Sequence, residues 1–259
     1  MSKPTLFDLT GKVALTTGSS KGMGRSLAEG LAIAGANVVI SSRKQDVCDE
    51  TAAAINELVG EQRAIGVACN IGHKDQLEAL VETTHKTYGE IDILMANAGV
   101  NPFYGPSSEI PDWAFDKTMA TNVKSNHWLA HMVLPDMVKK RDGVIVITSS
   151  NGAFMPSTHL GAYSISKAAD LALVRNLAAE YGKDNIRINA LCPGVFKTDF
   201  AQVLWQDEDG KDKPAEGITL DRFGEPEELR GVGVFLASRA ASYMTGQALI
   251  IDGGNVMVR

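Results

Sequence analysis

"TTGSSKGMG", residues 16–24, places three glycines within nine residues, directly after the apolar run "VAL" at 13–15. Glycine loses much conformational freedom on folding, so its concentration here needs a reason. A strand followed by a glycine-rich turn and a helix lets backbone N–H groups approach a phosphate, helped by the positive end of the helix dipole. An ordinary tight turn is the alternative, because the spacing Gly18-x-x-x-Gly22-x-Gly24 is wider at its first step than G-x-G-x-x-G.

Short β-rich runs alternate with longer amphipathic stretches along the chain. We expect strands at 12–18, 37–43, 63–70, 91–99, 143–150, 186–194 and 247–254, and helices at 23–35, 46–60, 74–89, 112–140 and 162–182. Asn122 marks a candidate break in the long helix, and Pro226 followed by acidic residues indicates another helix start. Alternating strands and helices predict parallel β-α-β units with right-handed crossovers. The expected fold is α/β: residues 1–259 as one Rossmann-fold domain, a doubly wound parallel sheet of about seven strands with helices on both faces.

Composition limits the function classes. The 259 residues carry a net charge of -6 and no basic stripe, which argues against a nucleic-acid surface. No run approaches the ~18 apolar residues that span a bilayer, and the start lacks the features of a signal peptide. Cys48, Cys69 and Cys192 fit neither a disulfide framework nor a zinc site. We expect no nucleic-acid partner, no membrane, no metal and a cytoplasmic location.

One irregular stretch lies between the last two expected strands. Residues 201–226 are polar and contain glycine, and a loop of this length inside a domain is usually functional or disordered. It follows the carboxyl end of a strand, where the ligand crevice of such a sheet lies. We therefore expect 200–226 to be a substrate lid.

The end of the second expected strand bears on the choice of dinucleotide. An acidic residue there would bind a ribose 2′-hydroxyl and repel a 2′-phosphate, but this chain has Ser42 and Arg43. Lys21 in the glycine turn adds a second cation. NADP(H) is therefore favoured, with NAD(H) possible, since Ser41 and Ser42 could serve a bare ribose and most such cations are simply solvated.

Four polar residues form a candidate catalytic set. Tyr163 and Lys167 lie four apart in "YSISK" and share one face of the expected helix, Ser150 ends the fifth strand, and Asn122 lies within the long helix. A tyrosine can protonate an alkoxide formed by hydride transfer, but its ordinary pKa of ~10 is high, and a nearby ammonium would favour the phenolate. Ser150 can hydrogen-bond the substrate oxygen, and Asn122 could hold a water that passes protons to Lys167.

These motifs together resemble the short-chain dehydrogenase/reductase family over essentially the whole chain. The matching stretches are "TGSSKGMG", "NAG" (97–99), "TNV" (121–123), "SS" followed by "YSISK", and "PGVFKT" (193–198). The resemblance implies that Asn122, Ser150, Tyr163 and Lys167 form the catalytic tetrad. Ser150 is preferred to Ser149 because the family spaces serine and tyrosine by 13, as do 150 and 163 here.

The resemblance also implies the cofactor contacts. The pyrophosphate would be lined by Gly18, Ser20, Gly22 and Met23, and the adenosine ribose by Asn97, Ala98 and Gly99. The nicotinamide would lie among Pro193, Gly194, Val195 and Thr198. The adenine would lie near Asn70 and Ile71, and the cofactor would also contact Tyr163 and Lys167. Asn70 departs from many members, which have an aspartate there.

The finer match is to the NADP-dependent carbonyl and retinal reductase branch. A small-molecule ketone or secondary alcohol is the expected substrate, with the candidate lining residues Asn101, Phe103, Phe154, Met155, His159, Phe200 and Trp205. A 3-oxoacyl thioester reductase and an NAD-dependent sugar or polyol dehydrogenase share every motif, and a catalytically silent dinucleotide-binding protein is a further alternative. The resemblance implies a homotetramer paired through the helices at 112–140 and 162–182, where Ala168, Ala169 and Ala172 would permit close helix approach.

Overall fold

The computed structural model describes residues 5–257, and these contain a seven-stranded sheet in the order β3-β2-β1-β4-β5-β6-β7. The strands are β1 (Val13–Thr17), β2 (Asn37–Ser42), β3 (Ala64–Ala68), β4 (Ile93–Ala96), β5 (Gly143–Thr148), β6 (Ile186–Pro193) and β7 (Ala248–Ile251). Every neighbouring pair is parallel. The predicted doubly wound α/β fold is confirmed.

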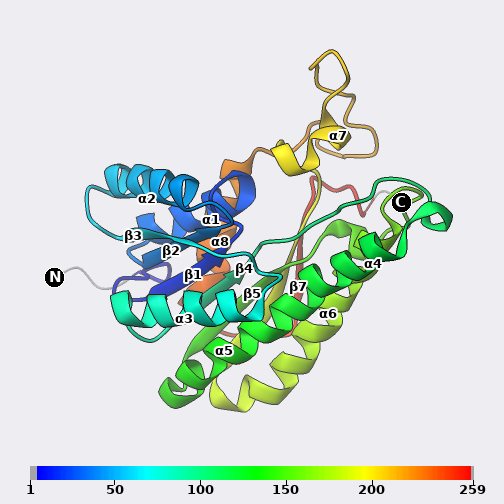
Figure 1. Cartoon of the computed structure of the whole chain (residues 1–259). Coiled ribbons are helices and arrows are strands. Elements are labelled where there is room, and N and C mark those ends of the chain that lie inside the picture. The colour runs from blue at the N-terminus through cyan, green and yellow to red at the C-terminus, as the bar shows by residue number, and fades with distance from the viewer. Residues whose placement is uncertain (1–4, 258–259) are drawn as a thin grey trace.

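Helices cover both faces of the sheet (Figure 1). α1 (Gly22–Ile33), α2 (Gln45–Val59) and α8 (Arg230–Ala237) pack on one face, and α3 (Lys74–Tyr88), α5 (Ser125–Lys140) and α6 (Gly161–Tyr181) on the other. Successive side chains along a strand point to opposite faces of the sheet. Leu15 and Leu94 therefore pack in the α3–α5–α6 core, while Ala14 and Met95 pack in the α1–α2–α8 core. Burial on both faces explains why the strands read as continuous apolar runs.

Several strands are shorter at their carboxyl ends than the sequence predicts. β4 stops at Ala96 rather than residue 99, because the Thr17 hydroxyl accepts hydrogen bonds from the backbone N–H groups of Asn97 and Ala98, both at 3.2 Å. A side chain thus replaces the strand ladder, and the backbone turns out of the sheet. The residues that leave the sheet line its carboxyl edge.

The break expected near Asn122 is confirmed as a π-helical turn. α4 (Asp112–Met119) leads into the π turn η2 (Ala120–Lys124), which continues as α5. Such a turn widens the helix by one residue and often marks a functional site. The Asn122 amide reaches out to the loop after β4, donating to the Val100 carbonyl at 3.0 Å and accepting from its N–H at 2.8 Å.

The helix start at Pro226 is also confirmed. A short 3-10 turn, η6 (Pro226–Leu229), runs directly into α8, and a capping box between Glu225 and Glu228 satisfies its first backbone N–H groups. Among residues 5–257, no helix is both long and apolar enough to cross a membrane.

Candidate active site

The strand order reverses between β1 and β4, and the glycine turn lies at this switch point, where ligands bind in open α/β sheets. Gly18 has a φ of +62°, and a Cβ on it would lie 2.8 Å from the Ala98 Cα. A Cβ on Gly24 would lie 2.2 Å from the Gly18 carbonyl oxygen. Only glycine fits at these two positions, so the turn can draw its backbone close to both a helix start and the loop after β4.

Asn97 provides an unpaired acceptor beside this turn. Its Nδ2 donates to the Gly18 carbonyl at 3.1 Å, while its Oδ1 is buried and has no hydrogen-bond partner among the described residues. Buried polar atoms in folded proteins are nearly always satisfied, so an orphaned acceptor in a crevice fits a ligand hydroxyl. The turn and this acceptor together suit a dinucleotide with its ribose against Asn97.

The loop after β6 also approaches the glycine turn. A Cβ on Gly22, whose φ is +50°, would lie 2.9 Å from Thr198 Cγ2. The Lys21 ammonium lies 3.1 Å from the Asp199 carboxylate, in a pair whose side chains are 68% and 82% exposed. Lys21 therefore reaches toward the Thr198 loop in this structure and is paired there with an acid.

The corner at the end of β2 has the expected residues. Arg43 is exposed, and Ser42 is turned toward Cys48, whose Sγ lies 3.2 Å from both the Ser42 N and Oγ. Ser19 ties this corner to the glycine turn, since its hydroxyl accepts from the Ser41 N–H at 2.9 Å. Arg43 is thus the cation that directly follows β2.

The remaining predicted cofactor residues line the carboxyl edge. Asn70 Oδ1 accepts from the Gly72 N–H at 3.2 Å, and the Ile71 side chain is buried in the α3–α5–α6 core, which leaves only its backbone for a ligand. The others belong to segments at the same edge: Ser20 to the glycine turn, Met23 to the first turn of α1, Gly99 to the loop after β4, Pro193 to the end of β6, and Gly194 and Val195 to the loop that follows.

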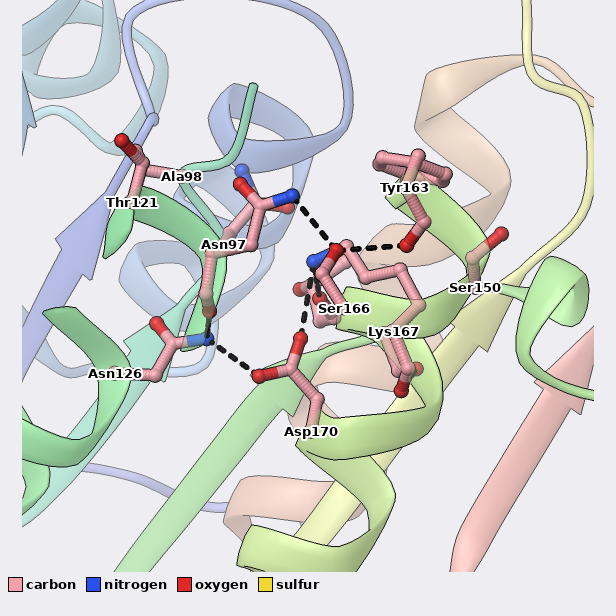
Figure 2. A network of polar contacts seen from close by, with 12 residues as sticks. Asn97, Ala98, Thr121, Asn126, Ser150, Tyr163, Ser166, Lys167 and Asp170 are labelled. Atoms are coloured by element: carbon pink, nitrogen blue, oxygen red, sulfur yellow. Dashed lines mark hydrogen bonds and ion pairs between the residues drawn. The ribbon is translucent and has the colours of Figure 1, made fainter. Parts of the chain in front are cut away.

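Tyr163 and Lys167 lie one helical turn apart on α6, as predicted (Figure 2). Lys167 is 3% exposed and its ammonium lies 5.7 Å from the centroid of the half-buried Tyr163 ring. The ammonium donates to the Thr148 carbonyl at 2.8 Å and to Asp170 Oδ2 at 3.1 Å. Burial opposes the charge of Lys167, but Asp170 and Tyr163 outweigh it, so its pKa lies above the ordinary value.

The two serines at the end of β5 point in different directions. Ser149 is buried, and its hydroxyl donates to the Lys167 carbonyl at 2.8 Å. Ser150 is half-buried, and its Oγ accepts from the Gly152 N–H at 3.0 Å. The Ser150 hydroxyl donates to Asn151 Oδ1 at 3.5 Å, a longer contact than that of Ser149. Ser149 therefore connects β5 to α6, while Ser150 is the serine whose hydroxyl can more readily turn to a ligand.

Three residues that sequence reasoning did not single out complete the network in Figure 2. Ser166 accepts from Asn122 Nδ2 at 3.0 Å, and Asn126 Nδ2 donates both to the Asn122 carbonyl at 2.6 Å and to Asp170 Oδ1 at 3.0 Å. Asn126 follows Asn122 by four residues and Asp170 follows Lys167 by three, so helical spacing could have placed them beside the predicted pair.

Two aromatic pairs include residues that we expect on the substrate side of the site. The Phe200 and Tyr163 ring centroids lie 6.2 Å apart, and Tyr104 stacks on His159 at 5.2 Å. Tyr104 was not among the expected lining residues, whereas Phe200 and His159 were. Phe154 is 45% exposed. Asn101, Phe103 and Met155 are half-buried nearby in the chain.

The stretch 200–226 is irregular apart from short turns and α7 (Gln202–Trp205). The Trp205 indole N–H donates to the Thr198 carbonyl at 2.9 Å, which anchors α7 to the loop after β6. Beyond Trp205 the chain extends away from the sheet and returns (Figure 1). At the return, the Leu220 N–H donates to the Gly253 carbonyl at 3.0 Å, so the segment is held at both ends.

Comparisons with known proteins agree with this geometry. Residues 18–255 match the family model described as enoyl-(acyl carrier protein) reductase. The chain is 42% identical over 247 residues to human dehydrogenase/reductase SDR family member 4, covering 95% of this chain and 88% of the relative. A 7α-hydroxysteroid dehydrogenase solved with NADH and 7-oxo glycochenodeoxycholic acid superposes with a TM-score of 0.90 at 33% identity, covering 98% of each chain. A Burkholderia cenocepacia gluconate 5-dehydrogenase solved with NADP and tartrate gives 0.91 at 29% identity, again covering 98% of each.

Proposed function

The chain belongs to the short-chain dehydrogenase/reductase family and is an oxidoreductase of alcohol and carbonyl groups, and on this premise we propose that it reduces ketones with NADPH through Asn122, Ser150, Tyr163 and Lys167. The observation that carries the proposal is the buried Lys167 ammonium 5.7 Å from the Tyr163 ring. A buried cation costs free energy, so its place beside a half-buried phenol favours a chemical role.

Tyr163 is the group that exchanges a proton with the substrate oxygen in this proposal. The nicotinamide cofactor, when bound, supplies or accepts the hydride at the substrate carbon. Tyr163 donates a proton to the substrate oxygen during reduction, and the Lys167 charge stabilises the phenolate that remains. In alcohol oxidation the same phenolate takes the proton back.

Ser150 and Asn122 have supporting roles in this proposal. The Ser150 hydroxyl donates to the substrate oxygen and keeps it in line with Tyr163. Asn122 supports α6, since its amide bonds Ser166, whose hydroxyl donates to the Tyr163 carbonyl at 2.7 Å.

NADP(H) is the cofactor that the β2 corner favours. Arg43 directly follows Ser42, and a carboxylate that would repel a 2′-phosphate is missing from this position. The related structures include both an NADH and an NADP complex, so the choice depends on residues of this corner rather than on the fold. Asn97, Ala98 and Gly99 would bind the ribose, and the glycine turn the pyrophosphate.

We propose a substrate of medium size with an apolar body. The Phe200 ring lies beside that of Tyr163, and the stacked rings of Tyr104 and His159 and the exposed Phe154 would add aromatic surface to the substrate side. The stretch 200–226 would act as the lid, hinged between the Trp205 anchor and the contact at Leu220. This environment favours a carbonyl compound over a sugar or polyol, whose many hydroxyls would need polar partners.

The assembly and location that we propose are a homotetramer in the cytoplasm. Ala168 and Ala172 lie exposed on α6, together with Ile165, which is 52% exposed, so this face offers small and apolar side chains to a partner helix. The three cysteines are free and buried, which suits a reducing compartment.

A turnover screen tests the proposed activity. We expect a panel of aromatic and alicyclic ketones to drive oxidation of NADPH, followed through the loss of the reduced nicotinamide absorbance. Polyols with NAD should give less. Tight binding of NADPH without turnover of any ketone, thioester or polyol would support the catalytically silent alternative instead.

A further inference from the structure

Asp170 is a fully buried carboxylate that the proposed reaction does not use. It lies on α6, three residues after Lys167, and its side chain is 0% exposed. Replacing a buried ion pair by well-packed apolar residues is often neutral or stabilising, so stability alone gives little reason for an acid at this position. Its contacts point to the neighbouring lysine instead.

Both carboxylate oxygens of Asp170 have partners in the site. Oδ2 accepts from the Lys167 ammonium at 3.1 Å, and Oδ1 accepts from Asn126 Nδ2 at 3.0 Å. The second N–H of that amide donates to the Asn122 carbonyl at 2.6 Å. Figure 2 shows Asp170 between Asn126 and Lys167, so one continuous chain of hydrogen bonds runs from the π turn to the ammonium.

We propose that Asp170 is a positioning residue for the reaction, which with Asn126 holds the Lys167 ammonium charged and fixed beneath Tyr163. The inference rests on the proposed function in that Tyr163 and Lys167 are taken as the reacting pair. Thr148 and Asp170 accept from two of the three ammonium N–H groups, and the third has no hydrogen-bond partner within residues 5–257.

The groups around the Lys167 ammonium explain why it depends on Asp170 to stay charged. Burial favours the neutral amine. The charged or titratable groups that act on the ammonium are Asp170 and Tyr163 on α6 and Cys192 on β6, and the Thr148 carbonyl is a neutral acceptor. Burial raises the pKa of the Cys192 thiol to about 11, so Cys192 is neutral at physiological pH. Burial also raises the pKa of Asp170, against the opposing effects of the Lys167 charge and the Asn126 hydrogen bond. Both of its oxygens accept hydrogen bonds, one of them from the ammonium, and this geometry suits a carboxylate. Asp170 is therefore the negative charge that offsets burial of the lysine.

The activity test is the pH profile of alcohol oxidation between pH 7 and 10.5. The wild-type chain should keep its activity up to the alkaline end, because Lys167 stays charged. In Asp170→Asn, Lys167 should lose its proton within this range, giving a new descending limb of about tenfold per pH unit beyond its midpoint. Asp136→Asn is the matched control, since Asp136 on α5 binds His85 at 2.7 Å and the Ile91 N–H at 3.1 Å and does not contact Lys167.

A purely structural role would lower activity at every pH and leave the shape of the profile unchanged, which would overturn the proposal. Circular dichroism and NADPH binding check that Asp170→Asn folds. If it does not, the wild-type chain decides the matter: ¹³C-lysine NMR, with the Lys167 signal assigned through Lys167→Arg, should show titration above that of the surface lysines. Titration below them would overturn the proposal. The NMR titration does not depend on enzymatic activity, so it distinguishes failure of the inference from failure of the proposed function.

Discussion

Arg43→Asp should reverse the cofactor preference. In the structure Arg43 is exposed at the end of β2, whereas Lys21 is paired with Asp199 at 3.1 Å across the glycine turn. Arg43 is thus the cation that can bind a 2′-phosphate directly, whereas Lys21 would first have to break its ion pair with Asp199. The substitution removes the attraction and offers a carboxylate to the free 2′-hydroxyl of NADH.

The magnitude follows from these two environments. A charge-assisted hydrogen bond contributes roughly 1.5–3 kcal/mol, and an exposed corner gives the lower end, so Arg43 alone accounts for about a tenfold preference for NADPH. An exposed ion pair is worth at most about 1 kcal/mol, so its loss should help Lys21 only modestly. Asp199→Asn should therefore raise kcat/KM for NADPH by about two- to fivefold and leave NADH unchanged.

The assay compares kcat/KM for NADPH and NADH at low ionic strength, with one ketone, across both variants and the wild type. Lys183→Asp on the distant turn η4 (Gly182–Asp184) makes the same change of net charge away from the crevice and should leave the ratio unaltered. A wild-type preference for NADH, or an Arg43→Asp ratio equal to that of the control, would refute the reasoning.

Three further outcomes can be measured. Ser150→Ala should lower kcat strongly with little loss of stability, whereas Ser149→Ala should chiefly lower the melting temperature because it frees the Lys167 carbonyl; the reverse pattern would assign the catalytic serine to Ser149. Burial raises the pKa of Cys69 from 9.0 to about 11, so the folded chain keeps a proton that the unfolded chain loses. Urea denaturation should show the free energy of unfolding falling above pH 9, by up to about 2.7 kcal/mol from this thiol. Cys69→Val should remove this part of the fall, while Cys192, with a similar pKa, keeps its own. Sedimentation should show a tetramer at micromolar concentration, and a stable monomer would contradict pairing through α5 and α6.

Much of the fold could be predicted from sequence because it depends on repeating patterns. Apolar runs marked each strand, and Gly18 and Gly24 marked the turn because no side chain fits there. The strand ends were less accurate. The apolar residues 93–96 do not show where the strand ladder stops, and only the long-range hydrogen bonds from the Asn97 and Ala98 N–H groups to Thr17 show that it ends at Ala96.

The polar network of the site was predicted only in part. Tyr163 and Lys167 were identified through their spacing, but Asp170 is a charged helical residue of the kind that usually faces solvent. Its burial depends on α5 packing across α6, which brings Asn126 to it from 44 residues away. The direction of Lys21 likewise depends on Asp199, 178 residues further along the chain.

The most direct test of the central claim is Tyr163→Phe, measured for both cofactor binding and turnover. The ring is kept and only the hydroxyl is lost, so NADPH should bind within a few-fold of the wild-type affinity. Ketone reduction should fall by at least about a hundredfold in kcat, the low end of general acid catalysis. Turnover within a few-fold of the wild type, with NADPH still bound, would contradict the assignment of Tyr163 as the proton donor.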